Sequence, residues 1–214
     1  PVCVEFMDNK GIRCVEAFFH DKLPHSDVGH YIIISVEGDN QDVLEDQCVF
    51  IDELCTANGA LEVLVADSEK IWKVRKSFGE ANRARSLIFS AEDTVVPMAK
   101  IPEVVHKLAE MGSKYGFSIH IAAHAADGNI HADILKEEVP LEQWNEQLPV
   151  FQDELYEFIY SVGGKLSGEH GIGYKRLALM EKYANPVELK MMRAVKKALD
   201  PNEIMNPGKI FNLE

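Results

Sequence analysis

Two histidines that flank a predicted hairpin turn are the residues of this sequence best suited to chemistry. Residues 117–136 read FSIHIAAHAADGNIHADILK, two apolar stretches separated by Asp127-Gly128, a dipeptide typical of tight hairpin turns. A hairpin centred on this dipeptide pairs His124 directly with His131, with Cβ atoms about 5 Å apart on one face. Two imidazoles at that separation can bind a divalent metal ion. The alternative is a pair of surface histidines that binds nothing.

The alternation of side chains along the two predicted strands supports this hairpin. One face is apolar and is expected to lie in the core, with Phe117, Ile119, Ile121, Ala123, Ile130, Ala132 and Ile134. The other face carries His120, Ala122, His124, His131, Asp133 and Leu135, so the polar residues share the side away from the core. On that face the Cβ atom of His120 is expected about 13 Å from that of His124, outside the candidate site.

A glycine-rich segment can supply a third ligand. Residues 167–173 read SGEHGIG, and the five glycines between positions 163 and 173 allow the backbone to approach a ligand closely. Glu169 and His170 are adjacent and point in different directions, so one can bind metal while the other transfers protons. The alternative is a solvated Glu-His pair on a turn. The glycine spacing matches neither the dinucleotide fingerprint nor the Walker motif.

The predicted elements that would position these residues alternate between strands and helices. Strands are expected at 30–36, 60–66, 93–97, 117–124 and 129–135, and helices at 41–57, 67–78, 101–115, 148–162 and 186–200. Residues 1–29 have no clear period, and 79–85 are typical of a polar loop. The pattern predicts an α+β fold of two ferredoxin-like halves, 30–85 and 86–165, each an antiparallel sheet with flanking helices. An active-site turn and C-terminal helices are expected over 166–214.

The amino-acid composition argues against some classes of binding partner and cellular location. The 22 basic residues against 35 acidic ones give a net charge of -13, which disfavours nucleic acid and anionic membranes as partners. The longest apolar run is strand-sized, so a soluble protein is expected. The four cysteines form no CxxC pair, which favours a reducing, cytoplasmic location. Cys48 and Cys55 share the apolar stripe of the helix at 41–57 and are expected to be buried.

Five motifs occur together in one order along the chain. They are IWKVRK at 71–76, EDTVVP at 92–97, HAADGNIH at 124–131, GEHGIG at 168–173, and DP through NPGKIF at 200–211. In this order they resemble the C-terminal domain of FAD-linked oxidases of the vanillyl-alcohol oxidase type, especially glycolate oxidase and the D-lactate and D-2-hydroxyglutarate dehydrogenases. The resemblance spans nearly the whole sequence.

The resemblance implies a reaction and a set of site residues. The implied metal ligands are His124, His131 and Glu169, with His170 as base, Arg75 as the substrate-binding residue and Asn206 as a cofactor-binding residue. The implied reaction oxidises a small D-2-hydroxy acid, glycolate or D-lactate, to the 2-oxo acid, with hydride passing to FAD. Zinc suits this ligand set best, although iron or manganese could occupy it. For Arg75 the alternative is an exposed helix charge beside Lys73 and Lys76.

The sequence also departs from the family pattern. Ala126 stands where members often have glycine, which would strain the turn if that position needed a positive φ. Ala91 and Glu92 stand where members that act on dicarboxylates tend to have lysine, so a monocarboxylic substrate is expected. Nothing matches the N-terminal domain that holds most of the FAD, so a fragment beginning at Pro1 is expected. The sequence does not identify the electron acceptor, and it leaves open whether the protein has partner subunits. The alternative function is a non-catalytic ferredoxin-like metal or metabolite sensor.

Overall fold

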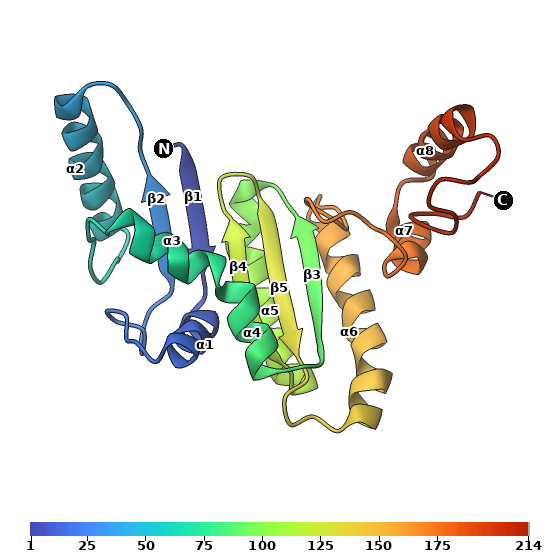
Figure 1. The fold of residues 1–214 in the computed structure, drawn as a ribbon, viewed down its shortest axis with the longest axis horizontal. Coiled ribbons are helices and arrows are strands. Elements are labelled where there is room, and N and C mark those ends of the chain that lie inside the picture. Colours follow the sequence, from blue (N-terminus) through green and yellow to red (C-terminus); the bar gives the residue numbers. More distant parts are fainter. Residues whose placement is uncertain (214) are drawn as a thin grey trace.

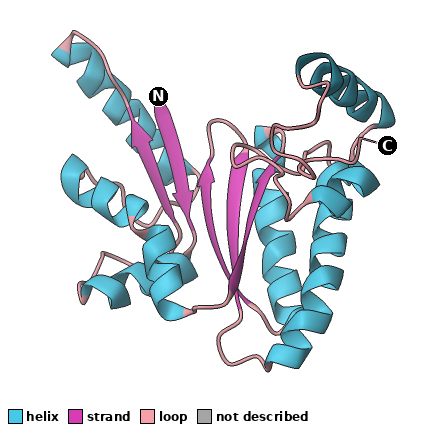
Figure 2. Cartoon of the chain, turned by 45° about the vertical axis from the view of Figure 1, so that its right-hand side comes forward, coloured by secondary structure: helices cyan, strands magenta, loops and turns pink. Residues whose placement is uncertain are grey.

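The computed structural model describes residues 1–213 and contains a five-stranded antiparallel sheet with helices on both faces (Figures 1 and 2). The strands are β1 (Cys3–Met7), β2 (Tyr31–Ser35), β3 (Phe89–Val95), β4 (Ser118–His124) and β5 (Asn129–Leu135). Their order in the sheet is β2-β1-β4-β5-β3. The α+β class and the antiparallel sheet with flanking helices are therefore confirmed.

Several helices begin or end at capping signals in the sequence. They are α1 (Asn9–Phe19), α2 (Gln41–Ala57), α3 (Ser68–Lys76), α4 (Phe78–Arg85), α5 (Ile101–Tyr115), α6 (Leu141–Ser161), α7 (Leu177–Tyr183) and α8 (Pro186–Leu199), with a short 3-10 helix, η1 (Met98–Lys100), before α5. The side chain of Asp67 caps α3 by accepting a hydrogen bond from the Lys70 backbone N–H. Gly116 ends α5 in the left-handed conformation, with φ of 71°. Residues 1–213 contain no helix long and apolar enough to cross a membrane.

The two faces of the sheet are covered by different helices. Helices α5 and α6 pack on one face, and their apolar side chains surround the hairpin residues predicted for the core, namely Phe117, Ile119, Ile121, Ala123, Ile130, Ala132 and Ile134. Helices α1 and α4 cover part of the other face, where Met7 and Ala122 contact Phe78. In Figure 1, α4 crosses in front of the sheet and α5 lies behind it. The predicted apolar face is thus confirmed, but the opposite face is also partly buried.

The half at 86–165 has the predicted ferredoxin-like order of strand, helix, strand, strand, helix. Strand β5 lies between β4 and β3, and a single antiparallel bridge joins Val95 to Lys165 after α6. The region 30–85 differs, since its one strand is β2, which pairs with β1. Both regions therefore contribute to one continuous sheet.

Three predictions for the N-terminal third are wrong. Residues 1–29, expected to lack regular structure, form β1 and α1. Residues 60–66, expected to be a strand, have no regular structure and do not join the sheet, in which β2 is an edge strand. Residues 79–85, expected to be a loop, belong to α4, where Phe78 and Ala81 provide an apolar contact for the sheet.

The hairpin register also differs from the prediction. The turn at 125–128 has four residues, so His124 pairs with Asn129 and His131 with Ala122, and the direct pairing of His124 with His131 is wrong. Gly128 has φ of 80° and ends this turn instead of lying at its centre. Because the shift is two residues, each side chain keeps its predicted face. The two histidines are diagonal neighbours.

Helix α2 stands away from the sheet at the upper left of Figure 1. Its apolar stripe is present, but within residues 1–213 no other element covers it, and none of its side chains is fully buried. Cys48 is exposed and Cys55 is only partly buried, so the prediction of two buried thiols is wrong.

Candidate active site

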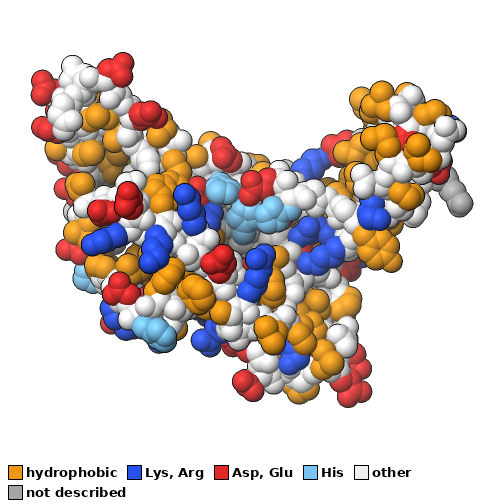
Figure 3. All heavy atoms as spheres, in the orientation of Figure 1, with side chains coloured by type: hydrophobic (Ala, Val, Ile, Leu, Met, Phe, Trp, Pro, Cys, Tyr) orange, Lys and Arg blue, Asp and Glu red, His pale blue; other side chains and the backbone are white. Residues whose placement is uncertain are grey.

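The candidate site lies where the ends of β4, β5 and β1 meet the loop at 167–173. Figure 3 shows histidine side chains gathered at the middle of this face, with Lys and Arg side chains on either side. Glu169 Oε1 lies 3.4 Å from His124 Nε2 and 3.0 Å from His131 Nε2. One donor atom from each of these residues lies within 4.8 Å of the others. The structure thus brings the three predicted metal ligands together.

Each of the two histidines also faces a second carboxylate. His124 Nδ1 lies 2.7 Å from Glu5 Oε1, and His131 Nδ1 lies 3.8 Å from Asp93 Oδ1. This leaves both Nε2 atoms directed at Glu169. A carboxylate that hydrogen-bonds a metal-binding histidine fixes the orientation of its ring, and Glu5 does so for His124. His131 Nδ1 and Asp93 Oδ1 are too far apart for a hydrogen bond and have no partner among the described residues.

Asp93 holds the loop that carries Glu169 and His170. Its Oδ2 atom accepts hydrogen bonds from the hydroxyl of Ser167 at 2.6 Å and from three backbone N–H groups, those of Gly168, Glu169 and His170, at 3.1, 3.1 and 2.8 Å. Burial of Asp93 by itself raises the pKa of its carboxyl group, but these hydrogen bonds outweigh burial and hold the pKa below its usual range. Asp93 is therefore ionised, and it fixes the loop to β3.

Gly168 is required where this loop meets the hairpin. A Cβ atom at position 168 would lie 2.2 Å from Asn129 Oδ1, far inside contact distance. Asn129 is 5% exposed and pairs with His124 in the sheet. The glycine lets the loop approach the strand that carries His131, as expected for a glycine-rich segment beside a ligand site.

His170 lies next to the three ligands on the solvent side. Its ring stacks on that of His131, with centroids 4.9 Å apart, and its Nε2 atom lies 3.9 Å from Glu169 Oε1. The His170 side chain is 51% exposed. Burial lowers the pKa of His131, which favours the neutral imidazole that binds metals.

Arg75 reaches the site through Glu5. Its Nε atom donates a 2.8 Å hydrogen bond to Glu5 Oε2, and its side chain is 13% exposed, so the alternative of an exposed helix charge is wrong. Among the described residues the Arg75 NH2 group is buried and has no hydrogen-bond partner. The sequence did not identify Glu5, because β1 was not predicted. The available signal was the β-branched and aromatic composition of VCVEFM.

Asn206 lies apart from the histidine and glutamate residues of the candidate site. It lies on an exposed turn after α8, with φ of 49°. The chain after it returns toward the site, since the backbone N–H of Ile210 donates a 2.7 Å hydrogen bond to the Gly173 carbonyl. Phe211 is buried in one apolar cluster with Met180 and Leu189, so the C-terminal tail packs against α7 and α8.

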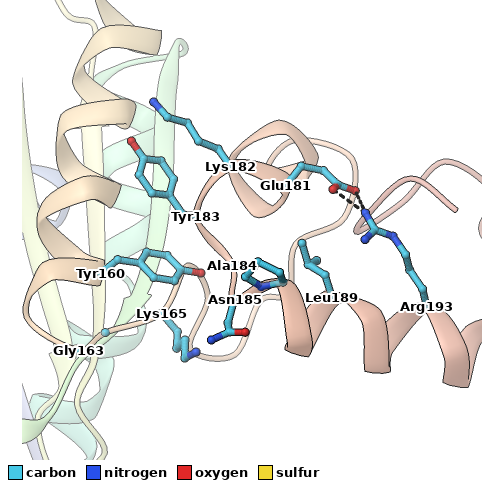
Figure 4. A pocket seen from close by; sticks show the side chains of 12 residues that line it. Tyr160, Gly163, Lys165, Glu181, Lys182, Tyr183, Ala184, Asn185, Leu189 and Arg193 are labelled. Carbon is cyan, nitrogen blue, oxygen red and sulfur yellow. Dashed lines mark hydrogen bonds and ion pairs between the residues drawn. The ribbon is translucent and has the colours of Figure 1, made fainter. Parts of the chain in front are cut away.

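A second surface depression lies between the end of α6 and helices α7 and α8 (Figure 4). Each of its cations is already paired: Lys165 with Glu188 at 2.6 Å, Lys182 with Asp153 at 2.5 Å, and Arg193 with Glu181 at 2.6 Å. This depression therefore offers no unpaired cation for a carboxylate substrate among the described residues.

Comparison with known proteins identifies the family. Residues 1–210 match the family described as FAD linked oxidases, C-terminal domain. The chain belongs to this family. In the FAD-linked oxidase fold, 4-ethylphenol oxidase from Gulosibacter chungangensis is similar in structure, with a TM-score of 0.64, 13% identity, and coverage of 98% of this chain and 47% of that chain.

Curated relatives in the family oxidise hydroxy acids, according to their names. D-lactate dehydrogenase from Anaerostipes hadrus is 32% identical over 98% of this chain and 46% of the relative. Glycolate oxidase subunit GlcD from Escherichia coli (strain K12) is 31% identical over 98% and 42%. D-2-hydroxyglutarate dehydrogenase from Stutzerimonas stutzeri (strain A1501) is 29% identical over 99% and 49%. The chain spans about half the length of these relatives.

The structure explains the departures from the family motifs. Ala126 is not among the residues with positive φ, so alanine causes no backbone strain there. Glu92 is buried and accepts a 2.5 Å hydrogen bond from the Tyr156 hydroxyl, with Lys175 Nζ at 3.3 Å and Arg176 Nε at 3.5 Å. Burial opposes ionisation of Glu92, but the neighbouring cations and hydrogen bonds lower its pKa.

Arg176, which is paired with Glu92, also binds the other end of the loop at 167–173. It donates hydrogen bonds to the carbonyl oxygen of Gly171 at 3.3 Å and to that of Ala91 at 2.7 Å. Glu92 is therefore an anchor for the loop and not a substrate contact.

Proposed function

We propose that this chain is the substrate- and metal-binding half of a flavin-dependent dehydrogenase that oxidises a small D-2-hydroxy acid to the 2-oxo acid. The observation that carries the proposal is the convergence of His124 Nε2, His131 Nε2 and the Glu169 carboxylate beside the exposed ring of His170. The names of the relatives support this reaction class. Glycolate and D-lactate are the proposed substrates.

The donor set suits a divalent metal ion. Two imidazole nitrogens and one carboxylate oxygen leave coordination positions open for substrate, which is the composition of many catalytic zinc sites. The Glu5 carboxylate behind His124 and the lowered pKa of His131 favour the ligand form of each ring. We assign zinc as the preferred ion, with iron and manganese as ions of similar ligand preference.

Residues of this chain would share the remaining tasks. When bound, the metal supplies a Lewis acid for the 2-hydroxyl group, and FAD supplies the hydride acceptor. His170 accepts the hydroxyl proton at Nε2, the atom nearest the ligands. The unpaired NH2 group of Arg75 donates to the substrate carboxylate, in a charge-assisted hydrogen bond. Asn206 contacts FAD, most of which we assign to a part of the protein outside this sequence.

A single carboxylate on the substrate fits the residues around the site. Ala91 pairs with Asp133 on the strand face that also carries Asp93 and His131, so no side-chain cation arises from that position. Glu92 points into the buried anchor. The cations that reach this part of β3, Lys175 and Arg176, are both paired with Glu92, so a second substrate carboxylate would find no unpaired cation there among the described residues.

The experiment that tests the proposal uses the complete gene product loaded with FAD. Anaerobic mixing with glycolate or D-lactate should bleach the flavin absorbance, whereas L-lactate should bleach it at least tenfold more slowly. Chelation should abolish bleaching, and added zinc should restore it. If protein shown to lack metal still bleached at the full rate, the proposed role of the metal would be wrong. If no D-2-hydroxy acid bleached the flavin, the proposed reaction would be wrong.

A further inference from the structure

We propose that Glu5 is a positioning residue for the metal site, fixing His124 in the tautomer that presents Nε2 to the ion. The inference rests on the proposed function, because it takes His124 as a metal ligand. Glu5 itself would touch neither the metal nor the substrate. Its effect would pass entirely through the His124 ring.

The sheet places Glu5 for this task. Glu5 on β1 is the direct partner of His124 in the antiparallel pairing of β1 with β4, so both side chains leave the same face. Glu5 is 4% exposed. A carboxylate on a central strand, paired with the strand that carries the ligand, has little freedom to move away from the ring.

The two oxygens of Glu5 have separate partners. Oε1 lies 2.7 Å from His124 Nδ1, and Oε2 accepts a 2.8 Å hydrogen bond from Arg75 Nε. Cys3 Sγ adds a weak contact at 3.5 Å. A buried carboxylate is costly unless it is paired, and Arg75 supplies the compensating charge. The ion pair with Arg75 therefore holds the Glu5 carboxylate at the position where its Oε1 atom meets the His124 ring.

An ionised carboxylate only accepts hydrogen bonds, so it dictates the tautomer of His124. Nδ1 must carry the proton, and Nε2 then keeps its lone pair, 3.4 Å from Glu169 Oε1. A neutral imidazole in the other tautomer would direct an N–H group at the ion. Glu5 thereby holds His124 in the metal-binding tautomer before the ion binds, which lowers the free-energy cost of metal binding.

Asp93 has the equivalent place behind His131, but its Oδ2 atom also holds the loop of Glu169. A substitution at Asp93 would disturb two ligands at once. Glu5 has no contact of that kind with the loop among the described residues, so it isolates the orienting effect.

The test is the substitution Glu5→Gln in the complete protein, with zinc affinity measured by competition against a chromophoric chelator. Arg75 Nε requires the amide oxygen, which turns the amide NH2 group toward His124 Nδ1 and favours the wrong tautomer. Zinc should bind about 10- to 100-fold more weakly. The matched control is Glu16→Gln, a buried carboxylate on α1 that pairs with Lys22 at 3.1 Å. The control should stay within twofold of wild type.

A second measurement separates orientation from stability. Nitrogen-15 spectra of labelled histidine in the metal-free protein should show His124 protonated at Nδ1 in wild type and at Nε2 in Glu5→Gln. If Glu5→Gln does not fold, Glu5→Asp serves instead, since it keeps the charge but withdraws it from the ring, and zinc should again bind more weakly.

Equal zinc affinity and the same His124 tautomer in both proteins would overturn the role of Glu5 while leaving the proposed metal site standing. If wild type bound no divalent ion, the proposed site would fall. The nitrogen-15 spectra of His124 would then be the measurement that tests whether Glu5 orients this ring.

Discussion

The imidazole rings of His131 and His170 stack with centroids 4.9 Å apart and planes inclined by 19°. The side chain of His131 is 19% exposed, whereas that of His170 is 51% exposed. In the proposed site, the inner ring of His131 binds the metal ion and the outer ring of His170 remains open to the substrate.

The first prediction separates catalysis from binding at His170. A base that removes the hydroxyl proton lowers the barrier more than it aids ground-state binding, so His170→Ala should reduce kcat by about 10² to 10⁴ with a modest change in KM. Zinc affinity should change little, because His170 is outside the ligand set. Steady-state kinetics of the complete enzyme measure both constants. A kcat within tenfold of wild type would assign the proton transfer to another group.

The second prediction concerns the metal. His131→Ala removes one of two imidazole ligands and should abolish binding of about one zinc ion per chain in calorimetric titration. The matched control is His106→Ala, an exposed histidine on α5, which should leave the isotherm unchanged. Indistinguishable isotherms for wild type and His131→Ala would exclude this ligand set.

The third prediction concerns Arg75. Its guanidinium can bind the substrate carboxylate in both the ground state and the transition state, so Arg75→Ala should raise KM. Because Arg75 also pairs with Glu5, this substitution should weaken zinc binding as well, so KM is measured with the zinc site saturated. A lost charge-assisted pair of about 2 to 4 kcal/mol corresponds to roughly 30- to 700-fold. Lys76→Ala, an exposed cation on the same helix, is the control and should leave KM unchanged. If KM in Arg75→Ala stayed within twofold of wild type, another cation would have to hold the substrate.

The fourth prediction concerns the loop that Asp93 holds. Asp93→Asn keeps an oxygen acceptor but loses the charge that receives four hydrogen bonds, so the loop of Glu169 and His170 should loosen. Hydrogen bonds to charged groups contribute about 1.5 to 3 kcal/mol each, and partial retention should limit the loss of unfolding free energy to about 2 to 4 kcal/mol. Amide hydrogen exchange at residues 168–170 should accelerate. If amide exchange at these residues were unchanged in Asp93→Asn, the loop would keep its conformation without the Asp93 charge, and the prediction would be wrong.

The hairpin shows what sequence alone could establish about the site. Side-chain alternation has a period of two, so the face of each hairpin residue could be predicted without the exact register. The register depended on the length of the turn, and Gly128 ends a four-residue turn. His124 and His131 were consequently placed on the correct face but in the wrong pairing.

Other parts of the site depend on distant pairing that local patterns do not encode. Glu5 lies on a five-residue strand with a buried charge at its centre, which hides the usual alternation. Asp93 reaches backbone groups about 75 residues later, and that contact accompanies the bridge that joins Lys165 to Val95 on β3. The grouping of Glu169 with the two histidines came from family resemblance, since no spacing rule links these segments.

The last prediction uses Asp8, a buried carboxylate away from the histidine cluster. Asp8 caps α1 by accepting a 2.9 Å hydrogen bond from the Gly11 backbone N–H, and burial raises its pKa to about 6. The folded protein thus binds this proton more tightly than the unfolded chain, whose carboxyl group has a pKa of about 4. The stability from Asp8 is complete below about pH 4 and is lost as the pH rises through about 6, by up to about 3 kcal/mol.

Asp8→Asn keeps the cap and removes the titration. At about pH 7.5 it should raise the free energy of unfolding by about 1 to 3 kcal/mol, and this gain should shrink toward zero at about pH 4. Urea unfolding of both proteins at several pH values measures the difference, which cancels the contributions of all other groups. Asp67→Asn, at the exposed cap of α3, is the matched control and should change stability by less than about 0.5 kcal/mol at either pH. A difference between Asp8→Asn and wild type that stayed constant across this pH range would mean that Asp8 does not titrate within it.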